Sequence, residues 1–139
     1  MSLHPRVLRD LLEVEADVAR ERLGDRVSSI VVGDDFVEVQ FTVKETPHRL
    51  RLTGKDYDRR PLSVSFVNQD GDPSPQEQWP PITMGSPHPV LGTPWVCLRG
   101  TLEYHLYAGH TAADDSWDVS RGDLRVPDVM DHVLQKCST

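Results

Sequence analysis

One short segment of this 139-residue chain gathers residue types that do chemistry. Within positions 97–110 stand a cysteine, a glutamate and two histidines: Cys97, Glu103, His105 and His110. A cysteine thiolate is a nucleophile for acyl transfer, and an unperturbed thiol ionises near pH ~8.5. Thiolate, carboxylate and imidazole groups are also zinc ligands, and four of them complete a tetrahedral site. The segment therefore predicts either a reactive cysteine or a zinc site.

The zinc interpretation depends on how residues 95–107 fold. We expect them to form a strand or an extended segment. In a strand, Cys97, Glu103 and His105 share one face, because side chains alternate between the two faces. A turn after the strand would then bring His110 back over that face.

Cys97 also has a less specific interpretation, because Val96 and Leu98 beside it are apolar and a cysteine between them can pack as a small hydrophobe. If the segment is extended, Arg99 shares the face of Cys97 and lowers the pKa of its thiol. We assign no chemistry to Cys137 near the C-terminus. Two cysteines in such different settings do not indicate a disulfide framework, which favours a reducing compartment.

Composition and charge exclude several classes of function. The net charge is −7 and the pI is near 5.2, so we expect no nucleic-acid partner, because phosphate backbones bind basic surfaces. No apolar stretch is long enough to span a membrane, and the N-terminus is typical of neither a signal peptide nor a transit peptide. We expect a cytoplasmic protein with one globular domain over residues 1–139.

The N-terminal region has the periodicity of an amphipathic helix over residues 5–23. Pro5 suits its first turn, and Gly24 suits its end. The apolar residues expected to pack against the rest of the protein are Leu8, Leu11, Leu12 and Val18.

Strand signals follow, at residues 27–32, 36–43, 49–53 and 62–67. The turn 33–35 between the first two predicts a hairpin, and the four together predict an antiparallel meander. Residues 69–94 hold most of the eleven prolines, which predicts a loop or flap. A terminal helix is expected to bury Val129, Met130, Val133 and Leu134. The tryptophans are expected to anchor the core or the flap: Trp79, Trp95 and Trp117.

Several of these features together resemble the ubiquitin-conjugating (UBC) family. The segment Asp-Tyr-Asp-Arg-Arg-Pro at 56–61, leading into a strand, is similar to the family's Asp-Tyr-Pro-x-x-Pro-Pro turn. His88-Pro89 is similar to the start of its His-Pro-Asn motif, and Cys97-Leu98 to its active-site Cys-Leu. Trp117 before a C-terminal helix matches the family's order too. The resemblance covers roughly residues 5–135.

This resemblance implies a UBC-like α+β fold and a role in a bacterial ubiquitin-like conjugation pathway. Cys97 would receive the modifier as a thioester from an activating enzyme and pass it to a protein target, with no cofactor required. His88 is implied as a site residue that holds the Cys97 loop by hydrogen bonds. Val90 stands where the family has the asparagine credited with stabilising the oxyanion. Asp114 and Asp115 either belong to a solvated loop, which we favour, or line the site as a base for the incoming lysine.

A second resemblance uses the same segment. The set Cys97, Glu103, His105 and His110 is similar to a cysteine–glutamate–two-histidine family, predicted to bind metal and encoded beside bacterial ubiquitin-like systems. It implies a catalytically inactive metal-binding protein of the same pathway. A scaffold on the same fold, without chemistry, is the third alternative.

Overall fold

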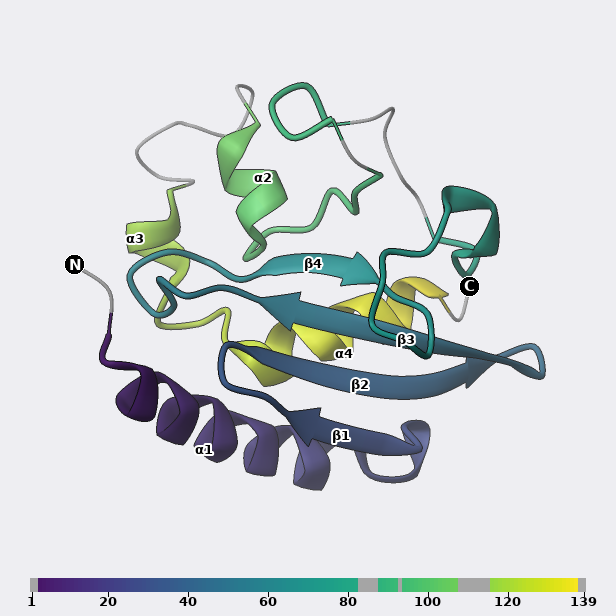
Figure 1. Ribbon diagram of the computed structural model, residues 1–139, viewed down its shortest axis with the longest axis horizontal. Coiled ribbons are helices and arrows are strands. Elements are labelled where there is room, and N and C mark those ends of the chain that lie inside the picture. The colour runs from purple at the N-terminus through teal and green to yellow at the C-terminus, as the bar shows by residue number, and fades with distance from the viewer. Residues whose placement is uncertain (1–2, 83–87, 93, 108–115, 138–139) are drawn as a thin grey trace.

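The computed structural model describes residues 3–82, 88–92, 94–107 and 116–137. Within them the fold is α+β, with an N-terminal helix, a four-stranded antiparallel sheet and a C-terminal helix, as the sequence predicts (Figure 1). The helices and strands are α1 (Pro5–Leu23), β1 (Ser29–Val32), β2 (Phe36–Val43), β3 (Thr46–Thr53), β4 (Ser63–Phe66), α2 (Leu102–Leu106), α3 (Trp117–Ser120) and α4 (Val126–Cys137). Short 3₁₀ turns lie at Gly24–Arg26 and Gln76–Gln78.

Helix α1 has the bounds that the sequence predicts. His4 caps it, because its Nδ1 accepts a hydrogen bond from the Arg6 amide at 3.2 Å. Gly24 ends it with a φ of 53°, a conformation that glycine adopts without strain. The prediction that Val18 packs inward is wrong, since this side chain is 51% exposed. The inward face is instead made by Leu8, Leu12, Glu15, Ala16, Ala19 and Leu23, and Val18 lies about 100° around the helix from Ala19.

The sheet is a simple meander with the order β1-β2-β3-β4. Strand β2 matches its predicted bounds, while β1 begins at Ser29 and β3 begins at Thr46. The predicted hairpin between β1 and β2 is confirmed by antiparallel pairing, with Val32 opposite Val37. Burial alternates along β2, so that one face of the sheet points into the core.

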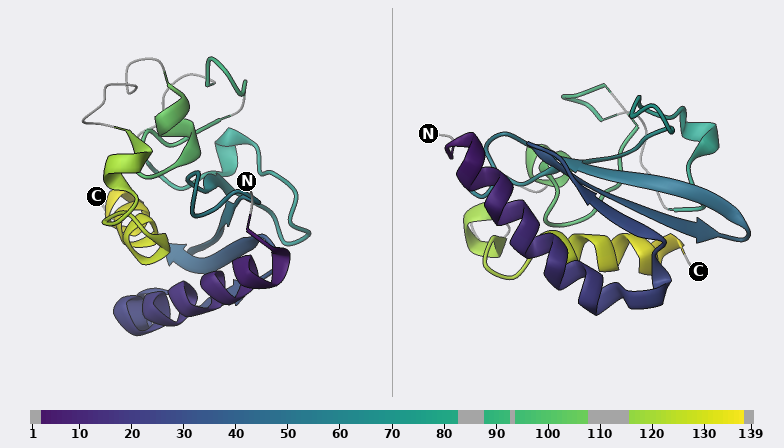
Figure 2. Two further views of the ribbon diagram at one scale, coloured as in Figure 1. Left: turned by 90° about the vertical axis from the view of Figure 1, so that its left-hand side faces the viewer. Right: turned by 60° about the horizontal axis from the view of Figure 1, so that its bottom comes forward.

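Helices α1 and α4 lie side by side and cover that face of the sheet (Figure 2). Helix α4 buries Val129, Met130, Val133 and Leu134, as predicted. Within the described part of the chain, no helix has the length and apolar character needed to cross a membrane.

The prediction of an extended segment over residues 95–107 is wrong in its second half, where helix α2 forms. The Thr101 hydroxyl caps α2 by accepting a hydrogen bond from the Tyr104 amide at 3.2 Å. The Leu102 amide donates to the Leu62 carbonyl at 2.9 Å, just before β4. Helix α2 is five residues long, so its formation depends on these tertiary contacts more than on periodicity.

Residues 68–82 fold back along the end of β4, where Pro73 forms an isolated antiparallel bridge with Val67 and the Ser74 amide donates to the Phe66 carbonyl at 3.0 Å. The Asn68 side chain accepts hydrogen bonds from the amides of Asp70 and Asp72, which shapes a tight turn. The indole of Trp79 donates to the Ser74 carbonyl at 3.0 Å and packs 4.9 Å from the Phe66 ring. Trp79 is therefore an anchor, as predicted, and Trp95 and Trp117 are also buried.

Candidate functional site

The segment before α2 presents Cys97 to solvent. Cys97 is exposed, whereas its neighbours Val96 and Leu98 are 2% and 6% exposed. The two apolar side chains fix the chain between them, and the thiol is left on the outside. The interpretation of Cys97 as a buried hydrophobe is thus wrong. Cys137 is the buried thiol, on the inner face of α4.

The electrostatic surroundings of Cys97 differ from the prediction. Partial burial raises the pKa of the Cys97 thiol, and the positive charge of Lys136 on α4 opposes this shift. We expected Arg99 to lower this pKa, but the charge that acts in this direction belongs to Lys136. A thiol with a raised pKa is mostly protonated at neutral pH, and its thiolate, once formed, is a strong nucleophile and a poor leaving group.

His88 lies buried near this segment, with 1% of its surface exposed. Its Nδ1 accepts hydrogen bonds from the amides of Val90 and Leu91 at 3.1 and 3.2 Å. Its Nε2 therefore carries the proton and donates to the Glu103 carbonyl at 2.7 Å. Both ring nitrogens are thus engaged in hydrogen bonds. His88 therefore positions the turn at residues 88–92, in keeping with the hydrogen-bonding role expected of it.

An aromatic stack links the His88 turn to α2. The ring of Trp95, two residues before Cys97, packs edge-on to the His88 ring at 4.8 Å. Trp95 also stacks with Tyr107, with ring centroids 5.6 Å apart, and the rings of His88 and Tyr107 lie 6.5 Å apart, so that the three rings form one cluster. This contact fixes one flank of Cys97 to the turn and to the end of α2.

The other flank of Cys97 is held by the first turn of α2. Leu98 is the residue after Cys97, and its carbonyl accepts hydrogen bonds from the Thr101 amide at 3.2 Å and from the Thr101 hydroxyl at 2.7 Å. The same hydroxyl caps α2. The position of the thiol therefore depends on where α2 begins.

The side chains of Glu103 and His105 do not share a strand face with Cys97, because both residues lie on helix α2. The Glu103 carboxylate is buried and accepts hydrogen bonds from the Ser63 hydroxyl at 2.5 Å and the Val64 amide at 2.9 Å. His105 Nε2 accepts a hydrogen bond from the Gly100 amide at 3.2 Å. Both carboxylate oxygens of Glu103 are thus engaged by β4 rather than presented with the thiol as ligands.

The remaining predicted site residues cannot be placed in the same way. His110, Asp114 and Asp115 lie outside the described residues. Over the ranges that the structure does describe, no three His, Cys, Asp or Glu side chains are grouped to hold a metal ion. The four-ligand zinc site stays a prediction.

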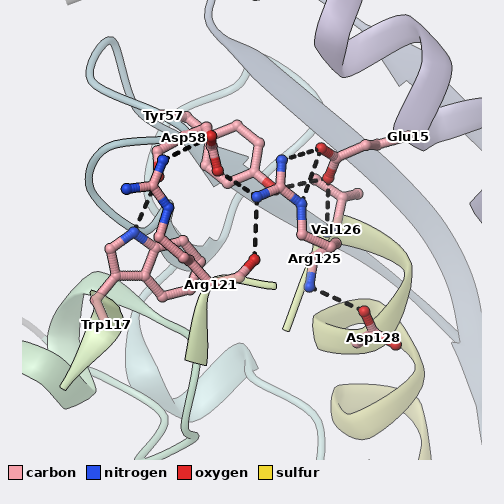
Figure 3. Close-up of polar contacts among 8 residues, drawn as sticks. All are labelled: Glu15, Tyr57, Asp58, Trp117, Arg121, Arg125, Val126 and Asp128. Atoms are coloured by element: carbon pink, nitrogen blue, oxygen red, sulfur yellow. Dashed lines mark hydrogen bonds and ion pairs between the residues drawn. The ribbon is translucent and has the colours of Figure 1, made fainter. Parts of the chain in front are cut away.

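A buried polar network at the 56–61 turn was missed at the level of sequence (Figure 3). The Tyr57 hydroxyl donates to Glu15 Oε1 on α1 at 2.6 Å, and the Val126 amide at the start of α4 donates to the same oxygen at 3.1 Å. The Arg125 guanidinium reaches both Glu15 and Asp58. The signal for this network was an acidic residue, Glu15, on the apolar face of the predicted helix.

The network also reaches α3. The Trp117 indole donates to the Asp58 carbonyl at 3.0 Å, and the Arg121 guanidinium pairs with the Asp58 carboxylate at 2.8 Å (Figure 3). The turn that resembles the UBC motif is therefore bonded to α1, α3 and the start of α4. Burial tends to lower the pKa of Arg125, but the hydrogen bonds that its guanidinium donates to Asp58 and Glu15 outweigh this effect and raise the pKa.

A separate groove lies at the other end of the sheet's last strands, away from Cys97. It has a volume of about 610 Å³ and opens between the end of the β2–β3 hairpin and residues 74–81. His48, Phe66 and Trp79 are part of its wall, whereas Cys97 is not. A small ligand bound in this groove would thus be separate from the thiol.

A scan of the chain against protein-family models and a search of curated proteins both gave no match.

Proposed function

We propose that this protein is a UBC-like carrier in a bacterial ubiquitin-like conjugation pathway. It accepts a ubiquitin-like modifier as a thioester on Cys97 and passes it to a protein target. The observation that carries this proposal is the exposure of Cys97 between two buried neighbours, on a segment held at both flanks. The order of helix, antiparallel meander, cysteine segment and C-terminal helix supports it.

The first reaction is a thioester exchange. The Cys97 thiolate attacks the carbonyl carbon of the modifier's C-terminal glycine, which the activating enzyme holds as a thioester. A new C–S bond forms, the C–S bond to the activating enzyme breaks, and that enzyme's cysteine leaves as a thiolate. The proton of Cys97 passes to solvent before the attack. This exchange requires no oxidant, metal or cofactor.

The second reaction transfers the modifier to an amine of the target. A C–N bond forms, the Cys97 thiolate leaves, and the amine proton passes to a base or to solvent. Val90, 65% exposed, brings no hydrogen-bond donor in its side chain to the oxyanion that develops. The raised pKa of Cys97 also makes its thiolate a poorer leaving group. Both features favour a carrier that holds its modifier for long and releases it slowly.

A scaffold without chemistry is the second candidate, and the same two observations favour it. A protonated thiol and the valine in place of asparagine fit a protein that binds the partners of the pathway and transfers nothing. The two candidates differ in whether a covalent adduct forms.

The test is reconstitution with the activating enzyme, the modifier and ATP, analysed on gels with and without a reducing thiol. We expect wild-type protein to form an adduct that the thiol removes. Cys97→Ser should form an oxyester that the thiol does not cleave, because an alkoxide is a poorer leaving group than a thiolate. Cys97→Ala should form no adduct.

Cys137→Ala is the matched control, because Cys137 is buried and burial raises its pKa to about 11. It should form the adduct as the wild type does. An adduct of equal yield in Cys97→Ala would show that the nucleophile lies elsewhere. Absence of any adduct with the wild type would leave the scaffold as the better account.

A further inference from the structure

Glu103 is an acidic residue in an unusual place. Its side chain is 3% exposed on a helix of only five residues beyond the edge of the sheet. Burying a carboxylate costs free energy unless hydrogen bonds compensate. Burial raises the pKa of Glu103, while hydrogen bonds from Ser63 and Val64 oppose this shift.

The carboxylate satisfies an edge strand. β4 pairs only with β3 among the described strands, so a β4 amide that points away from β3 needs another acceptor. Glu103 Oε1 accepts from the Val64 amide, and Oε2 accepts from the Ser63 hydroxyl. Next to it the Leu102 amide bonds to the Leu62 carbonyl. At the start of β4, the first turn of α2 thus satisfies edge groups that a neighbouring strand would otherwise pair, and the Ser74 amide bonds the Phe66 carbonyl at its end.

The main chain of Glu103 faces the Cys97 region. Its carbonyl accepts the hydrogen bond from His88 Nε2, and His88 in turn accepts from the Val90 and Leu91 amides. Trp95 packs on the His88 ring. A displacement of Glu103 would therefore move the contacts on the N-terminal flank of Cys97.

The C-terminal flank depends on the same turn. Thr101, two residues before Glu103, fixes the Leu98 carbonyl through its amide and its hydroxyl. The contacts on both sides of Cys97 are accordingly made by the first turn of α2. The side chain of Glu103 attaches this turn to β4.

We propose that Glu103 is the positioning residue of the Cys97 site, acting through His88 and Thr101 by fixing the start of α2 to β4. The importance of this position for transfer rests on the proposed function. The effect on the accessibility of the thiol does not, because alkylation of Cys97 measures it without any partner.

Two substitutions separate hydrogen bonding from charge. Glu103→Gln retains both contacts, because the amide oxygen can accept from the Val64 amide and the amide nitrogen can donate to the Ser63 hydroxyl. Glu103→Ala removes both. Glu21→Ala, at an exposed glutamate of α1, is the matched control.

Two rates are measured, well below each variant's unfolding temperature: alkylation of Cys97 by iodoacetamide, and formation of the thioester adduct. For Glu103→Ala we expect alkylation to rise about threefold, since a loosened segment exposes the thiol more. We expect adduct formation to fall about tenfold, since attack needs a defined geometry. Glu103→Gln and Glu21→Ala should stay within about twofold of the wild type in both rates.

Opposite changes in the two rates distinguish positioning from stability alone, which alters neither rate in the folded protein. If Glu103→Ala lowers the melting temperature and leaves both rates unchanged, the proposal is wrong. If Glu103→Gln behaves like Glu103→Ala, the charge matters and the proposal is also wrong.

The test also covers a variant that does not fold and a wild-type protein that forms no adduct. If Glu103→Ala does not fold, Ser63→Ala replaces it, because this variant removes only one of the two contacts, and changes in the same directions are expected. If wild-type protein forms no adduct, the proposed function fails, and the alkylation rates still decide the role of Glu103.

Discussion

Glu15 and Glu103 are both buried carboxylates, but the protein compensates them by different means. Glu15 faces the guanidinium of Arg125 and accepts from Tyr57 and Val126, so that it is part of an ion-paired network between α1 and α4. Glu103 accepts from a hydroxyl and an amide of β4, and neither of these donors is charged.

This difference predicts how each region responds to substitution of its residues. In the Glu15 network opposite charges are held together, and loss of one partner leaves another charge buried. In the Glu103 region neutral donors define a geometry, and a neutral residue of the same shape can replace the carboxylate. We infer that the first region mainly secures the fold and the second mainly secures the position of Cys97.

The largest effect should come from Arg125→Met. This change removes the partner of both Glu15 and Asp58, so the free energy of unfolding should fall by about 3–5 kcal/mol. Urea denaturation followed by circular dichroism measures it. A loss below about 1 kcal/mol would mean that the network does not secure the fold.

A smaller effect is expected for His88→Ala. It leaves the Glu103 carbonyl and the amides of Val90 and Leu91 without their present partner, which should cost about 1–3 kcal/mol. Hydrogen exchange should quicken at the Val90 and Leu91 amides and stay unchanged in β2. Uniform quickening across the sheet would contradict the assignment of His88 to the Cys97 region.

The Glu15 network should also respond to acid. Burial tends to raise the pKa of Asp58, but hydrogen bonds from Arg125 and Arg121 outweigh this effect and hold the pKa below its ordinary value. The stabilising contribution of Asp58 is therefore present above the ordinary pKa of an aspartate and is lost as the pH falls through the lowered pKa of the folded protein. In melting curves recorded from pH 7 to pH 2.5, Asp58→Asn should weaken the dependence on acid, and an unchanged slope would argue against the ion pairs.

The smallest effect is expected for Arg22→Ala. Arg22 pairs with Asp128 and Asp131, but its side chain is 43% exposed, and exposed ion pairs contribute about 0–1 kcal/mol. A loss as large as that of Arg125→Met in the same urea assay would mean that burial does not distinguish the two kinds of ion pair.

The sequence predicts the elements that local signals define. Proline, glycine and regular periodicity delimit α1, and strict alternation delimits β2, so both match their predicted bounds. Helix α2 was missed because it is too short to show periodicity, and because Leu62 and β4, distant in sequence, stabilise it.

The candidate site was also predictable only where local sequence signals define it. The motifs imply a reactive Cys97, which requires the exposure that the structure shows, and they imply the hydrogen-bonding role of His88. The partners of Glu103 and Glu15 do not, because Ser63 is 40 residues from Glu103 and Arg125 is 110 residues from Glu15. A carboxylate in an apolar pattern indicates that a partner exists, but the fold determines which one.

The most direct test of the account is protection of Cys97 from alkylation. Wild-type protein is treated with iodoacetamide before and after incubation with the activating enzyme, the modifier and ATP, and each cysteine is analysed by peptide mass spectrometry. We predict that Cys97 is labelled before loading, protected after it, and labelled again once a thiol removes the modifier, while Cys137 stays unlabelled. Labelling of Cys97 that ATP and the modifier leave unchanged would contradict its assignment as the thioester-forming residue.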